Sequence, residues 1–259
     1  MRIKFLSAKE ARDYFKEPDE YAKRLPLSNL RMIDDENPSL DRYMELFLES
    51  FQDFKEESKK AISKHAEKMK DFDIEIKLVA TNRNNSLDIT QTRKDVIVVA
   101  GGSLGYTTFV HEVYHILSRN YPNLTPTLAS ILGFKQIEEV PVKDERHLLN
   151  PDSLFTNYSI ELNLNGQTVE AIPYMVLGLS TRLMDKHGNS LDSKWEDVYE
   201  DIFPFTSYTA QPEEICAEYF AITFAGACLF SSSNKKNDIF LKQYKKQVKL
   251  MLKELKVLL

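Results

Sequence analysis

The stretch Thr107-Thr-Phe-Val-His111-Glu112-Val-Tyr-His115-Ile-Leu-Ser118 carries the strongest signal in the chain. Its apolar residues recur at helical spacing and predict a buried helix from about Tyr106 to Ser118. Two histidines four residues apart share one face of such a helix and can place two imidazole nitrogens on one Zn²⁺ ion. Glu112 would point toward the open side of that metal, where a carboxylate can take a proton from a water molecule.

A catalytic zinc ion needs a third protein ligand and an open fourth position. The metzincin class would place glycine and histidine three and six residues after His115, but Ser118 and Tyr121 stand there, which excludes that class. A later segment, Gln211-Pro-Glu-Glu-Ile-Cys-Ala-Glu-Tyr-Phe-Ala221, predicts a helix with Glu214 and Glu218 on one face. A metal and the N–H of a ligand histidine would satisfy two such carboxylates. Alternatively, they form an exposed acidic face at the start of a helix.

These two motifs together resemble the gluzincin metallopeptidases, and their pattern is closest to that of lethal-factor-like catalytic domains. The segment Glu-x-x-Ala-x-x-Phe-Ala is also similar to phage-repressor-associated metallopeptidases. The resemblance covers roughly residues 95–230. It implies that His111, His115 and Glu214 bind zinc, that Glu112 is the general base, and that Glu218 accepts a hydrogen bond from His111.

The resemblance also implies a role for Tyr208, which matches the tyrosine that stabilises the oxyanion in lethal-factor-like sites. Its spacing to the ligand glutamate is six residues here rather than the seven expected, and a tyrosine that only packs is the alternative. The Gly-x-Met-x-Asn motif of the aminopeptidase branch is absent, so an exopeptidase has no support. His147 is expected in a loop or at the surface, with a second oxyanion donor as the alternative, and His65 and His187 are expected to be solvated.

Composition limits the class of protein. The chain has 259 residues, 42% hydrophobic and 28% charged residues, and a net charge of −5, which argues for a globular fold and against a nucleic-acid binder. We expect a cytoplasmic protein without a membrane partner, because no signal peptide or membrane-spanning run is visible. Cys216 and Cys228 are expected on one helix, too far apart for a disulfide.

The order of predicted elements indicates an α+β chain, and the resemblance implies a zincin-like fold, mostly helical with a small sheet. We expect a single domain over 1–259, with a helical N-terminal layer (1–70) and a catalytic part (71–259). In it the motif helix packs against the glutamate-bearing helix. The predicted helices are Ser7 to Phe15, Ser39 to Lys70, Tyr106 to Ser118, Thr125 to Leu132, Pro212 to Phe230 and Asp238 to Leu259. The predicted strands are Ile74 to Leu78, Val96 to Val99, and a hairpin of Tyr158 to Leu164 and Val169 to Met175 around Asn165-Gly166.

The leading functional hypothesis is a zinc-dependent peptidase, an endopeptidase acting on a peptide or protein substrate. The alternative is a catalytically silent zincin-fold module for protein interaction. A third hypothesis is a toxin-type effector that cuts one host protein. We expect the run Val96–Val99 to form the sheet edge that pairs with an extended peptide. The sequence does not indicate the substrate or the oligomeric state.

Overall fold

Two β-sheets and a set of helices form the part of the chain that the computed structural model describes, which is residues 1–82, 89–164, 166–177, 180–191, 203, 206, 211–229 and 239–258. The helices are α1 (Ala8–Phe15), α2 (Glu20–Arg24), α3 (Leu27–Ile33), α4 (Leu40–Ser50), α5 (Glu56–Lys68), α6 (Tyr106–Asn120), α7 (Leu124–Ile131), α9 (Pro212–Phe224) and α10 (Ile239–Glu254). The strands are β1 (Arg2–Phe5), β2 (Phe51–Gln52), β3 (Glu75–Thr81), β4 (Gln91–Arg93), β5 (Val96–Ala100), β6 (Phe134–Gln136), β7 (His147–Leu148), β8 (Tyr158–Leu164), β9 (Gln167–Val176) and β10 (Ser180–Met184).

The first sheet has the strand order β1-β3-β5-β4, with β2 also pairing with β3. The pairs β1–β3 and β3–β5 are parallel, whereas β4 runs antiparallel to β5. Every residue of β5 is buried, as a β-branched run inside a parallel sheet requires. The prediction that Val96–Val99 forms the sheet edge is therefore wrong. β5 lies between β3 and β4, and among the described strands β4 and β1 are at the two ends of the order.

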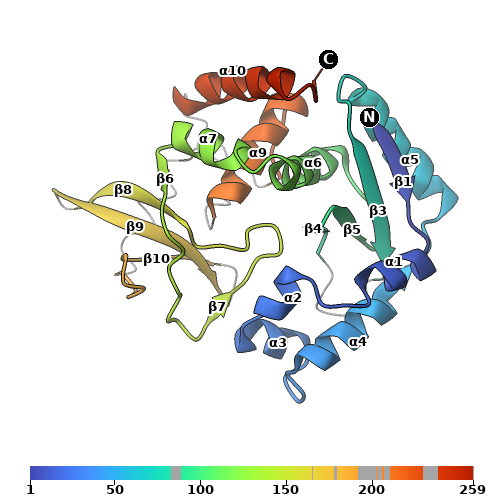
Figure 1. Cartoon of the computed structure of the whole chain (residues 1–259), viewed down its shortest axis with the longest axis horizontal. Helices are drawn as coiled ribbons and strands as arrows, with labels where there is room; N and C mark the ends of the chain where they lie inside the picture. Colours follow the sequence, from blue (N-terminus) through green and yellow to red (C-terminus); the bar gives the residue numbers. More distant parts are fainter. Residues whose placement is uncertain are drawn as a thin grey trace.

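The second sheet is antiparallel, with the order β10-β9-β8-β6 and with β7 also pairing with β9. The predicted hairpin is confirmed, because β8 and β9 pair directly from Ile160↔Ala171 to Leu164↔Gln167. Figure 1 shows α6 and α9 in the middle of the molecule, with β8–β10 on one side and β1 and β3 on the other. This mixture of helices and strands confirms the α+β class.

The predicted helix from Ser39 to Lys70 is two helices separated by β2. The apolar spacing continues through Phe51 and Phe54, but both side chains are buried where the chain leaves α4 and pairs with β3. Asp53 then accepts a hydrogen bond from the Ala8 backbone N–H at 2.7 Å, which holds this link against the start of α1. The N-terminal layer is thus not purely helical, because β1 and β2 join the first sheet.

The helix α9 ends at Phe224, earlier than predicted, and Gly226 follows with a φ of +78° that favours glycine. Cys216 is therefore buried within α9, whereas Cys228 lies beyond its end, so the two cysteines do not share one helix. No disulfide joins them, as expected. None of the described helices is both long enough and apolar enough to cross a membrane.

A buried ion pair joins the N-terminal layer to the edge strand β4. The Arg93 side chain is almost inaccessible and donates hydrogen bonds to both carboxylate oxygens of Asp19, one at 2.8 Å, and to the Tyr43 hydroxyl at 2.6 Å. Burial opposes ionisation of Asp19, but the hydrogen bonds and charge of Arg93 hold the pKa of this carboxyl below its ordinary value. The pair fixes the position of β4 next to the motif helix.

Replacing Asp19 with alanine is expected to lower the free energy of unfolding by about 3–5 kcal/mol, because Arg93 is left buried without its counter-ion. The matched control, Glu45→Ala, removes an exposed partner of Arg42 and should cost at most about 1 kcal/mol. Urea denaturation measures both. Since the folded pKa of Asp19 is depressed, its contribution is present above the unfolded pKa and is lost as pH falls through the folded value. The gap between wild type and Asp19→Ala should therefore narrow from pH 5 toward pH 2, and a constant gap would contradict this.

Candidate metal centre

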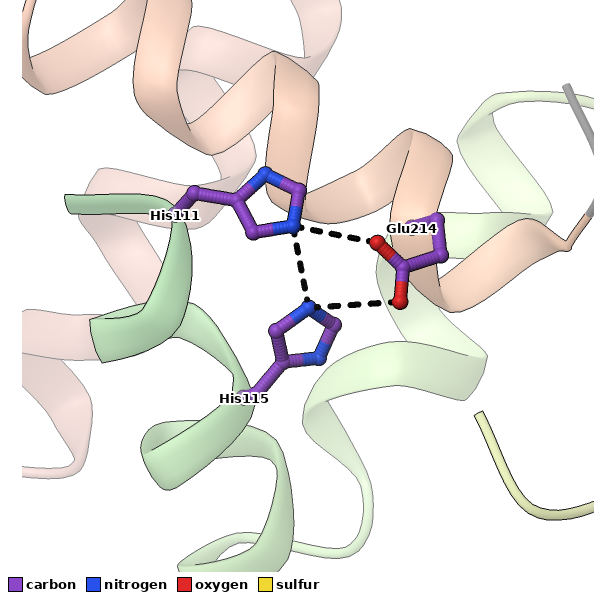
Figure 2. A group of neighbouring side chains, drawn as sticks. All are labelled: His111, His115 and Glu214. Carbon is purple, nitrogen blue, oxygen red and sulfur yellow. Dashed lines mark hydrogen bonds and ion pairs between the residues drawn. The ribbon is translucent and has the colours of Figure 1, made fainter. Parts of the chain in front are cut away.

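Two helices far apart in the sequence bring the predicted metal ligands together. His111 and His115 lie on α6, and Glu214 lies in the first turn of α9, where Pro212 occupies the start of the helix. All three side chains are buried, and their ligand atoms lie within 4.8 Å of one another. Figure 2 shows both imidazole rings and the carboxylate converging on one point. We call these three residues the His–His–Glu cluster.

The distances within the cluster are short. The Nε2 atoms of His111 and His115 are 3.2 Å apart. Glu214 places Oε2 at 3.0 Å from His111 Nε2 and Oε1 at 3.7 Å from His115 Nε2. The juxtaposition predicted from the two motifs is therefore present.

A tetrahedral metal fits this donor set. With bonds of 2.0–2.1 Å, a tetrahedral Zn²⁺ ion separates its ligand atoms by about 3.3 Å. The two imidazole Nε2 atoms lie 3.2 Å apart, close to that value, and one Glu214 oxygen lies near each of them. The Nδ1 atom of His115 is buried without a hydrogen-bond partner, so the ring is not held by other polar contacts on that side. Among the described residues, no further histidine, cysteine or carboxylate joins the group, and two imidazoles with one carboxylate are a donor set that catalytic metal sites use.

The charges around the cluster also favour a cation. Burial opposes protonation of His111, but the hydrogen bonds that its ring donates to Glu214 and Glu218 raise its pKa well above the ordinary value. Burial likewise opposes ionisation of Glu214, but the two histidines lower the pKa of its carboxyl. The buried Glu214 carboxylate is therefore ionised and needs a positive charge next to it. A protonated histidine can provide that charge, and so can a metal ion.

Glu218 orients one of the histidines. Its Oε1 lies 3.0 Å from His111 Nδ1, which leaves Nε2 for the centre of the cluster. Glu218 is fully buried and also accepts hydrogen bonds from the Thr206 hydroxyl at 3.1 Å and the Leu229 backbone N–H at 3.1 Å. The contact between Glu218 and His111 is the one that the sequence predicted. Glu214, one turn earlier on α9, is the glutamate that reaches both histidines.

Glu112 is held by the edge strand. The Thr92 hydroxyl donates a hydrogen bond of 2.7 Å to Glu112 Oε2. Burial and the negative charge of Asp152 raise the pKa of Glu112 to about 8. A carboxyl group with a raised pKa, beside a candidate metal centre and fixed by a hydroxyl, has the properties of a general base.

Three residues of the site were not predicted from the sequence: Thr92, Asn150 and Asp152. Asn150 donates to Glu214 Oε1 at 2.8 Å, and Asp152 accepts the Thr92 backbone N–H at 2.7 Å. Asn150 and Asp152 belong to the segment Asn150-Pro151-Asp152, which follows β7. Polar residues beside a proline are ordinary in a loop, so this segment gave no specific indication of a site.

The remaining predicted residues have different outcomes. Tyr208 lies outside the described residues. His147 forms part of β7, is partly buried, and does not line the cavity in front of the cluster. His187 is exposed, as predicted. The prediction for His65 is wrong, because its Nε2 lies 3.0 Å from the Leu104 carbonyl and its ring packs near Tyr106 and Phe109.

Comparison with known proteins adds no assignment: no family model matches the chain, and neither a curated protein nor a solved structure gives a significant match. The interpretation of the site therefore depends on its residues and their geometry.

Substituting Asn150 by alanine is expected to weaken binding of a Zn²⁺ probe by about 10–100-fold, because Glu214 loses the donor that fixes one of its oxygens. The control is Asn163→Ala, which removes an exposed asparagine of β8. Competition with a fluorescent chelator measures the affinity, and thermal denaturation checks that both variants fold. Equal affinities of the two variants for Zn²⁺ would show that Asn150 does not contribute to metal binding.

Proposed function

We propose that this protein is a zinc-dependent endopeptidase with a zincin-like fold, in which His111, His115 and Glu214 hold the metal. The observation that supports it most strongly is the convergence of these three buried side chains beside Glu112. The first sheet, whose strands β4 and β5 contact α6, and the second helix α9, which carries Glu214, are consistent with that fold. Bound there, Zn²⁺ would lower the pKa of a coordinated water and polarise a carbonyl group.

Glu112 takes the proton of the attacking water in this proposal and later delivers it to the leaving amine. The Thr92 hydroxyl keeps its carboxylate in position, and burial excludes bulk water from the acceptor. Glu218 holds His111 in the tautomer that leaves Nε2 for the metal, and Asn150 holds Glu214. Tyr208 as an oxyanion donor remains a prediction.

The first test combines metal content with a conservative variant of Glu112. Elemental analysis of the purified protein should find one zinc ion per chain, and a chelator should remove both the metal and any peptide hydrolysis. Glu112→Gln is expected to retain zinc and to lose hydrolysis by about 10²–10⁴-fold, because an amide cannot accept the proton. A protein that binds zinc but cleaves no peptide in an unbiased library would support the silent module instead. Unchanged turnover in Glu112→Gln would show that another group is the base.

A second test separates the two glutamates of α9. Glu214→Ala is expected to abolish tight zinc binding, because a direct ligand is lost. Glu218→Ala should weaken it by about 10–100-fold, the usual cost of losing a residue that orients a ligand histidine. Zinc titrations against a competing chelator rank the two variants. If Glu218→Ala binds no zinc while Glu214→Ala still does, the assignment of the two residues is inverted.

A further inference from the structure

A cavity of about 490 Å³ opens directly onto the candidate catalytic residues, since His111, Glu112 and Glu214 are part of its lining. Volumes of this size are usual for sites that bind small ligands or single side chains with their neighbours. Most of the remaining wall is apolar and comes from several elements of the fold. These apolar residues include Met32, Ile33, Ile89, Leu148, Met175 and Leu229, with Leu149 and Pro151 beside the acidic and amide groups.

Within the described lining of the cavity, positive charge is confined to the His–His–Glu cluster, at His111 and at a metal ion bound there. Glu112, Asp152 and Glu214 are acidic, and no lysine or arginine is among the described residues that line the cavity. Each acidic group also has a partner within the protein, and Asp152, for example, accepts the Thr92 N–H and lies 3.6 Å from Arg119. An acidic side chain of a ligand that lies against the apolar wall, away from the cluster, would lose its hydration without gaining a counter-charge, which costs free energy.

One wall comes from the N-terminal layer and is fixed to the site. Asn29 of α3 donates to the Leu149 carbonyl at 3.1 Å and accepts the Leu149 N–H at 2.8 Å. Leu149 directly precedes Asn150, the residue that contacts Glu214. The two apolar residues of α3 that line the cavity, Met32 and Ile33, are therefore held at a fixed position relative to the His–His–Glu cluster.

Exposure of the apolar wall points to a ligand contact. Met32 is 46% exposed and Ile89 is 57% exposed, although both are large apolar side chains, and both line the cavity. Leu27, on the same helix as Met32, is 50% exposed but does not line it. Apolar surface gathered beside a polar catalytic cluster is typical of a binding site and not of an ordinary protein surface.

We propose that this cavity binds an apolar side chain of the substrate next to the cleaved bond, that Met32 and Ile33 of α3 contact it, and that acidic side chains are rejected. This proposal rests on the proposed peptidase function and names its substrate class. It gives the N-terminal layer a direct part in selecting the substrate.

The test uses fluorescent peptides built from glycine and serine, with one central residue that is leucine, lysine, glutamate or serine. Binding is measured by fluorescence anisotropy on zinc-loaded Glu112→Gln, so that the result does not depend on hydrolysis, and cleavage is measured on wild type. We expect the leucine peptide to bind at least about tenfold more tightly than the glutamate peptide. Met32→Lys should reduce that ratio about tenfold, because it places a positive charge on the wall, whereas Leu27→Lys should leave it unchanged.

Met32→Gln, which keeps the length of the side chain without its apolar character, provides a second variant should the lysine disturb α3. It should weaken binding of the leucine peptide without improving that of the glutamate peptide. Equal binding of the leucine and glutamate peptides, or the same effect from lysine at Met32 and at Leu27, would overturn the proposal. Hydrolysis without a preference would contradict this proposal alone. A clear preference in binding without any hydrolysis would contradict the peptidase function and leave the apolar site standing.

Discussion

The structure around the site depends on one contact, that between α6 and α9 at His111, His115 and Glu214. Burying two imidazoles and a carboxylate costs free energy unless they satisfy one another or bind a metal. Both helices are buried along most of their length, so within the contact between them water does not hydrate these groups. The remaining partners come from Glu218, on α9 itself, and from Asn150, which follows β7.

Much of this arrangement could be predicted from the sequence, because it follows from local spacing. Histidines four residues apart on an apolar helix share a face, and Glu214 and Glu218 do the same on the next buried helix that follows the second sheet. Asn150 and Thr92 could not be predicted, because their contacts join residues 64 and 20 positions apart and leave no periodic trace. Tertiary folding alone brings them to the site.

The errors in the fold have similar causes. A continuous β-branched run such as Val96–Ala100 signals a strand buried on both faces, but it does not reveal which strands lie beside it. The true edge, β4, has three residues and no pattern of its own. In the same way, Phe51 and Phe54 continue the helical spacing of α4, but they are buried where the chain has left the helix and pairs with β3. A prediction from the spacing alone therefore extends that helix too far.

The position of β4 at the edge changes how a peptide could be bound. The Thr92 N–H is the group that an added strand would use, but Asp152 already accepts it, and the Thr92 hydroxyl is committed to Glu112. Strand addition along this edge is therefore blocked at Thr92. In the proposed peptidase, a substrate would gain specificity from side-chain contacts in the adjoining cavity, which Ile89 and Thr90, just before β4, line together with Met32 and Ile33 of α3. Thr92 thus contacts the proposed base and occupies a backbone contact that an added strand would use, so the proposed selectivity is assigned to the apolar wall and not to strand pairing.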